Sequence, residues 1–165
     1  MAAFLEKGMP LLDQDIKLFI SGLGPDKDKV QRLSESPDLK NRVKYIFLED
    51  ENLAMLRAEV DLFLMPNVPY LGDLEGFGIA PLECMYDGTP VVAFAVDALV
   101  ESVQKGGYLI PPNDYKAYTD QIHQYFKLSK KEKQALQTEA KEYVRQEYTW
   151  EKTAREYLDL FEGKP

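Results

Sequence analysis

Between residues 61 and 95 the chain reads DLFLM-PNVPYLGDLEGFG-IAPLECMYD-GTP-VVAFA. The first and last five residues are short, mostly apolar runs without polar alternation, which is typical of parallel strands covered by helices on both faces. Between them, Ile79–Asp87 has the spacing of a helix that follows a glycine-containing loop and ends before Gly88. A strand, a helix and a second strand in this order predict a βαβ unit and therefore a parallel sheet.

The same alternation continues on both sides of this unit. Turn residues such as Gly24-Pro25 and Pro111-Pro112-Asn113 separate the segments. The predicted strands are Ile16–Ile20, Val43–Phe47, Asp61–Met65, Val91–Ala95 and Tyr108–Ile110, and the predicted helices between them are Asp26–Ser34, Glu51–Ala58 and Ile79–Asp87. The sequence therefore predicts an α/β fold, a Rossmann-like parallel sheet with helices on both faces, in one domain over residues 1–165.

After Pro112 the pattern is helical only. The residues that share one face of the next helix are Tyr115, Tyr118, Ile122, Tyr125 and Phe126. Ser129 and Glu132 form a capping-box signature for a second helix. Thr149 can cap a last helix, whose apolar stripe consists of Trp150, Ala154, Tyr157, Leu158 and Phe161. We expect both stripes to pack on the core, because helices that cover a sheet must bury such a face; a partner surface is the alternative.

Composition and charge exclude several classes of protein. The chain has 28 acidic and 20 basic residues, a net charge of −8 and no basic patch, which argues against nucleic-acid binding. The single cysteine, Cys84, fits a reducing compartment, and it is too far from His123 in the sequence to suggest a metal site. No apolar run reaches the roughly 18 residues of a membrane span, and no signal-peptide pattern is present. We therefore expect a cytoplasmic protein.

The loop and helix start at residues 75–83 contain the candidate binding chemistry. Ligands of open parallel sheets bind beyond the carboxyl ends of the strands, where this loop lies. Gly76 and Gly78 allow close backbone approach, and the helix N-terminus behind them suits an anion such as diphosphate. Glu75 precedes the helix, and Glu83 could reach back toward the same pocket to accept hydrogen bonds from sugar hydroxyls. From spacing alone, two solvated glutamates around a glycine turn are an equally good interpretation.

The stretch EGFGIAPLECMYDGTPVV (residues 75–92) resembles the Glu-x7-Glu signature of glycosyltransferase family 4, whose members are retaining enzymes of the GT-B fold. Further segments match in the same order, and the resemblance extends from about Phe4 to Phe161. The loop Asn67–Asp73 is similar to that of the phosphatidylinositol-mannosyltransferase-like branch. The resemblance implies the C-terminal, donor-binding half of a two-domain hexosyltransferase.

The resemblance also implies a role for each residue of the motif. Glu75 would bind donor-sugar hydroxyls beside the reacting carbon, and Glu83 would hold the ribose hydroxyls. The backbone amides that would contact the sugar and the diphosphate are those of Gly76, Phe77, Gly78 and Ile79. The reaction would move a sugar from a nucleoside-diphosphate sugar to an acceptor hydroxyl with retention of configuration. It would need neither metal nor cofactor, because preorganised donors stabilise the leaving group.

Members of this family also have, upstream, a central strand, an arginine and a lysine that bind the diphosphate, and an acceptor-binding domain. Residues 2–8 resemble the end of the helix after that strand, which implies a domain without its first strand and without the acceptor domain. We therefore expect no sugar transfer by the chain alone. Either the flanking strands close up, or another chain fills the sheet gap, for instance by self-association. Any peripheral membrane association would depend on the acceptor domain.

Two other classes of function are alternatives to a donor-binding glycosyltransferase domain. A non-catalytic nucleotide-sugar-binding or partner-subunit module would keep the same pocket. A nicotinamide-dependent enzyme is disfavoured, because no Gly-x-Gly-x-x-Gly follows a first strand with an acidic residue about 20 positions later. The sequence leaves the nucleotide, the sugar and the acceptor open.

Overall fold

The structure, a computed structural model, describes residues 1–69 and 77–163. Within these residues the strands are β1 (Leu18–Ile20), β2 (Val43–Tyr45), β3 (Phe63–Met65), β4 (Val91–Phe94) and β5 (Gly107–Ile110). Every strand pair is parallel: β1 pairs with β2, and β4 pairs with β3 on one side and β5 on the other. The predicted parallel α/β class is confirmed, and each predicted strand is present, the first four with a shorter span and β5 longer by one residue.

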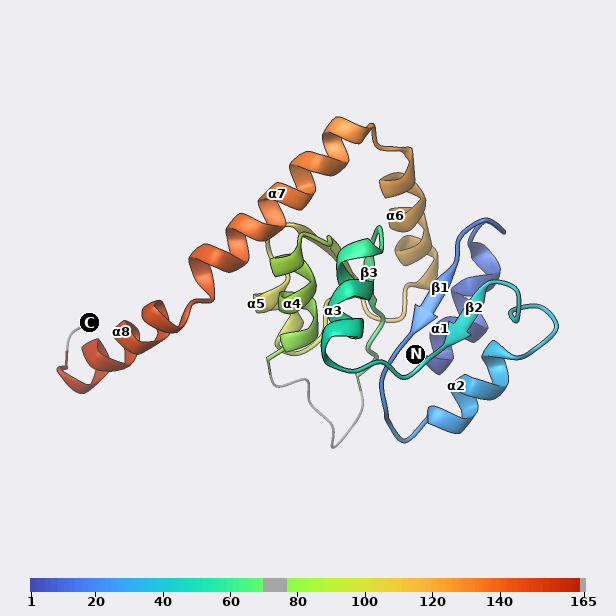
Figure 1. Cartoon of the computed structure of the whole chain (residues 1–165), viewed down its shortest axis with the longest axis horizontal. Helices are drawn as coiled ribbons and strands as arrows, with labels where there is room; N and C mark the ends of the chain where they lie inside the picture. The colour runs from blue at the N-terminus through green and yellow to red at the C-terminus, as the bar shows by residue number, and fades with distance from the viewer. Residues whose placement is uncertain (70–76, 164–165) are drawn as a thin grey trace.

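Helices lie on both sides of the strands (Figure 1). The N-terminal ones are α1 (Ala2–Lys7), the 3-10 helix η1 (Met9–Leu11), α2 (Lys27–Ser34) and α3 (Asp50–Glu59). The later ones are α4 (Ile79–Asp87), α5 (Leu99–Ser102), α6 (Tyr115–Lys127), α7 (Lys130–Glu147) and α8 (Trp150–Phe161). Helix α4 has the bounds that its sequence predicts, because a glycine in the left-handed conformation lies at each end. None of the described helices is long and apolar enough to cross a membrane.

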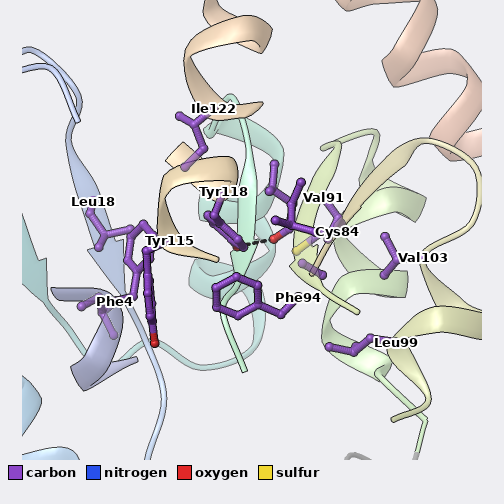
Figure 2. Close-up of a cluster of buried hydrophobic side chains, with 14 of the residues drawn as sticks. Phe4, Leu18, Cys84, Val91, Phe94, Leu99, Val103, Tyr115, Tyr118 and Ile122 are labelled. Carbon is purple, nitrogen blue, oxygen red and sulfur yellow. Dashed lines mark hydrogen bonds between the residues drawn. The ribbon is translucent and has the colours of Figure 1, made fainter. Parts of the chain in front are cut away.

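The strands form two separate sheets, β1-β2 and β3-β4-β5. Of the two alternatives that the sequence left open, closing up of the flanking strands is not seen among the described residues, because β1 and β3 do not pair. The core is nevertheless continuous between the two sheets. Tyr118 of α6 contacts Phe4 of α1 at 5.3 Å and Phe94 of β4 at 4.8 Å between ring centroids, and its hydroxyl donates to the Val92 carbonyl (Figure 2). Aromatic packing from α6 thus joins the sheets where backbone pairing does not.

The two C-terminal apolar stripes differ in burial. In α6, Tyr115, Tyr118, Ile122 and Tyr125 are buried as expected, but Phe126 of the same predicted stripe is 39% exposed. In α8 no residue is buried, and Trp150 and Phe161 are 87% and 80% exposed. The expectation that the α8 stripe packs on the core is therefore wrong. The physical reason is that α8 extends away from the layered part of the molecule at the end of α7 (Figure 1).

The predicted caps that start the last two helices are confirmed. The Ser129 hydroxyl accepts from the Glu132 amide at 3.3 Å, and the Glu132 carboxylate accepts from the Ser129 amide at 2.8 Å. The Thr149 hydroxyl accepts from the Lys152 amide at 3.1 Å. Both caps depend on residues a few positions apart, which is why the sequence alone indicates them.

Candidate functional site

Helix α4 begins at Gly78, which has φ +74° and ψ +51°. A β-carbon at this position would lie 2.8 Å from Ser102 Oγ and 2.9 Å from Leu99 Cδ2, so both the backbone conformation and the close approach of α5 require glycine. No side chain in residues 1–69 or 77–163 caps this helix start. The first amides of a helix have no partner within it, and here those of Ile79 and Ala80 can donate to a bound anion.

The structure describes some, but not all, of the candidate residues around this helix start. Glu75 and Gly76 lie outside the described residues. Phe77 and Ile79 have exposed side chains at the start of α4. Glu83 lies one turn after Ile79, and residues at this spacing share one helix face. The structure therefore places Phe77, Gly78 and Ile79 at the start of α4, with Glu83 one turn further along the Ile79 face.

Glu83 forms an ion pair with Arg57 that the sequence does not indicate. Its Oε2 lies 3.1 Å from Nη1 of Arg57 on α3, and Nε of Arg57 lies 3.1 Å from Oδ2 of Asp87. Arg57 thus bridges two carboxylates one turn apart on α4. Among the described residues only Arg57 bonds Glu83, and only through Oε2, so Oε1 can still accept from a ligand hydroxyl. Arg57 and Glu83 are 26 positions apart, and only the packing of α3 on α4 pairs them.

Two tyrosines contact helix α5 and the ring of Phe77, which precedes the first turn of α4. The hydroxyls of Tyr143 and Tyr148 both lie 3.1 Å from the Glu101 carbonyl oxygen, and the Tyr148 ring meets the Phe77 ring edge-on at 5.8 Å between centroids. Burial, followed by the hydrogen bond with Tyr148, raises the pKa of Tyr143. The Tyr143 phenol therefore stays protonated at neutral pH. No local sequence pattern indicates these contacts.

Ser102 is almost fully buried beside Gly78, and no group among the described residues hydrogen-bonds its Oγ. Ser102→Ala is expected to raise the free energy of unfolding by about 1 kcal/mol, because it removes a buried polar group without a partner. Ser34→Ala is the matched control, since the buried Ser34 hydroxyl donates to the Gln31 carbonyl at 2.7 Å. Urea denaturation should therefore show that Ser34→Ala lowers the free energy of unfolding. A loss of stability in Ser102→Ala would show that its hydroxyl has a partner.

Neither Cys84 nor a metal cluster adds chemistry to the described part of this site. Burial raises the pKa of the Cys84 thiol to about 12, so the side chain packs as a neutral apolar group. Among residues 1–69 and 77–163, no group of three His, Cys, Asp or Glu side chains is placed to hold a metal ion.

Residues 2–143 match the protein family described as glycosyl transferases group 1. Because the match extends over most of the chain, the chain belongs to this family. The putative colanic acid biosynthesis glycosyltransferase WcaL of Escherichia coli is 29% identical over 87% of this chain, which spans 36% of that protein. The phosphatidyl-myo-inositol mannosyltransferase of Mycobacterium leprae is 32% identical over 66% of this chain, which spans 28% of that protein.

The fold also matches solved glycosyltransferases. The crystal structure of Anabaena Alr3699/HepE in complex with UDP superimposes with a TM-score of 0.80 and 21% identity, over 98% of this chain and 44% of that one. The chain thus corresponds to the C-terminal half of a GT-B fold, as expected from the sequence. It spans about a third of the length of curated relatives such as WcaL of Escherichia coli.

Proposed function

We propose that residues 1–165 form the donor-binding domain of a retaining, metal-independent glycosyltransferase of family 4. The observation that supports this most directly is the start of α4. Gly78 there is left-handed, no side chain among the described residues caps the helix, and the first helix amides lie at the ligand-binding edge of a parallel sheet. Glu83 lies one turn behind these amides, in reach of a second part of the same ligand.

In this proposal each part of a nucleoside-diphosphate sugar contacts a different group. The amides from Gly76 to Ile79 bind the diphosphate and Glu75 binds the sugar. Glu83 Oε1 accepts from a ribose hydroxyl while Arg57 holds Oε2. No cofactor is needed, and the departing diphosphate is stabilised by donors already in position.

The relatives support a nucleotide ligand of this kind. HepE is described in complex with UDP, and another structure of the same protein contains UDP-glucose. The rest of the enzyme would supply the acceptor site, so the 165-residue chain alone is expected to bind the donor without transferring sugar. A cytoplasmic location, where nucleotide sugars are made, fits the single buried cysteine.

Calorimetric titration of the 165-residue chain with UDP, GDP and ADP tests this function. One nucleotide is expected to bind, and Glu83→Ala is expected to weaken its binding by about tenfold or more, since a hydrogen bond to a charged group is lost. The matched control is Asp87→Ala. It also removes one ion pair of Arg57, but Asp87 is not a proposed ligand.

The two variants separate binding from stability. Each removes one carboxylate from Arg57, so their effects on unfolding should be similar, whereas only Glu83→Ala should change affinity. Equal affinity losses in both variants would show that Arg57 pairing, not a ribose contact, matters. A folded chain that binds none of the three nucleotides would contradict the proposed function.

A further inference from the structure

Helix α7 packs along α4 in the opposite direction. At the end of α4, a β-carbon added to Gly88 would lie 2.5 Å from Cε of Lys141. Further along α7, the guanidinium carbon of Arg145 lies 5.1 Å from the centre of the Tyr86 ring, which is earlier in α4. Helix α7 therefore proceeds toward the start of α4, and its C-cap residue Tyr148 lies there.

The backbone of Tyr148 is fixed by the helices on both sides of it. Its amide donates to the Val144 carbonyl at 2.9 Å in the last turn of α7. The next residue, Thr149, caps α8 with its hydroxyl. A helix that packs on α4 thus presents the Tyr148 side chain at a defined place.

The Tyr148 side chain contacts both elements that border the start of α4. Its ring meets the Phe77 ring edge-on at 5.8 Å between centroids, and Phe77 directly precedes the N-cap residue Gly78. Its hydroxyl donates to the Glu101 carbonyl of α5 at 3.1 Å. Helix α5 approaches Gly78 so closely that an added β-carbon would lie 2.8 Å from Ser102 Oγ. Tyr148 therefore links the residue before the N-cap to the helix beside it.

Burial alone does not fix the orientation of Phe77, whose side chain is 53% exposed. The residue after it is a glycine, which allows the chain more backbone conformations than any other residue does. Fixing a residue in one conformation on binding costs entropy. A contact that fixes Phe77 before a ligand arrives removes this cost from the free energy of binding.

Tyr143 shows which part of Tyr148 is needed. Its hydroxyl, five positions earlier in the chain, also donates to the Glu101 carbonyl at 3.1 Å. The Glu101 carbonyl therefore keeps a donor when the Tyr148 hydroxyl is removed. Loss of the Tyr148 ring, in contrast, removes its edge-on contact with Phe77. The ring, and not the hydroxyl, is the part that can fix Phe77.

We propose that Tyr148 is a positioning residue of the donor-binding site. Its ring fixes Phe77, and with it the backbone amides at the start of α4 that bind the diphosphate. The inference rests on the proposed donor-binding function and adds to that site a residue from the end of α7. Because Tyr148 acts through Phe77, replacing its ring weakens nucleotide binding, and removing its hydroxyl does not.

Calorimetric titration with UDP, GDP and ADP tests this role in the 165-residue chain. Tyr148→Leu should weaken binding of the nucleotide that the wild-type chain binds by roughly five- to tenfold, because the ligand must then order the Phe77 backbone. Tyr148→Phe keeps the ring and should stay within about twofold of the wild type. The matched control is Tyr86→Leu, which removes a half-exposed ring from the same helix pair far from the site and should leave affinity unchanged.

Phe77→Leu completes a double-mutant cycle. If the Tyr148 ring acts through Phe77, Tyr148→Leu should cause no further loss of affinity in a chain that already has Phe77→Leu, so the two losses are not additive. Additive losses would overturn the proposal. So would an unchanged affinity in Tyr148→Leu, or a loss in Tyr148→Phe as large as that in Tyr148→Leu.

NMR relaxation of the nucleotide-free chain separates this inference from the proposed function. The backbone order parameter of Phe77 should be near about 0.85 in the wild type and in Tyr148→Phe, and below about 0.6 in Tyr148→Leu. Equal order parameters in all three chains would overturn the proposal whether or not a nucleotide binds. A wild-type chain that binds no nucleotide, while Tyr148→Leu still makes Phe77 mobile, would contradict the donor-binding function and support the positioning contact.

Discussion

Replacing Gly106 with alanine is expected to lower the free energy of unfolding by more than about 3 kcal/mol. Gly106 lies just before β5 with φ +77°, and a β-carbon there would be 2.2 Å from the Cα and 2.7 Å from the nitrogen of Ala140 in α7. The left-handed conformation alone costs about 1–2 kcal/mol with a side chain. The contact is with helix backbone, which no rotamer change relieves, so α7 would have to move.

Chemical denaturation followed by circular dichroism measures this effect. Gly24→Ala is the matched control, because Gly24 has nothing within 4 Å of an added β-carbon. Its effect should stay within about 0.5 kcal/mol. If both variants were equally stable, α7 would not pack against Gly106 as closely as the structure shows.

Replacing Tyr118 with alanine is expected to cost about 3–5 kcal/mol, the range for large aromatic truncations in a core. Tyr118 is fully buried and lies between Phe4 and Phe94, so it connects the parts of the core that belong to the two sheets (Figure 2). Removing the ring would leave a cavity between the parts of the core that belong to the two sheets. The same denaturation experiment measures the loss.

Tyr118→Phe distinguishes packing from hydrogen bonding. It keeps the ring and removes only the bond to the Val92 carbonyl. The expected loss is about 1 kcal/mol, the usual net value of one hydrogen bond. A loss as large as that of Tyr118→Ala would show that the hydroxyl, and not the ring, holds the sheets together.

Most elements of the fold were predictable because their signals are local. The apolar runs of the strands and the glycines that bound α4 act over a few residues. The capping box at Ser129 is equally local. The α8 stripe shows the limit of this reasoning: an amphipathic pattern indicates that a helix has an apolar face, but not which surface covers it.

The candidate site was predictable in part. Gly78 and Glu83 belong to one motif, and the structure places Gly78 at the start of α4 and Glu83 in the middle of the same helix. Arg57 and Ser102 were missed, because they reach this motif from α3 and α5. No periodicity or short motif marks either residue.

Sequence alone was sufficient for the class of fold, the parallel strand-helix units and the motif that relates this chain to glycosyltransferases. These properties follow from backbone preferences and side-chain periodicity within short segments. The division into two sheets, the exposure of α8 and the Arg57 bridge to Glu83 and Asp87 are visible only in the tertiary structure. Each depends on distances between residues far apart in the chain, which are determined by how the elements pack and not by the preferences of any one of them.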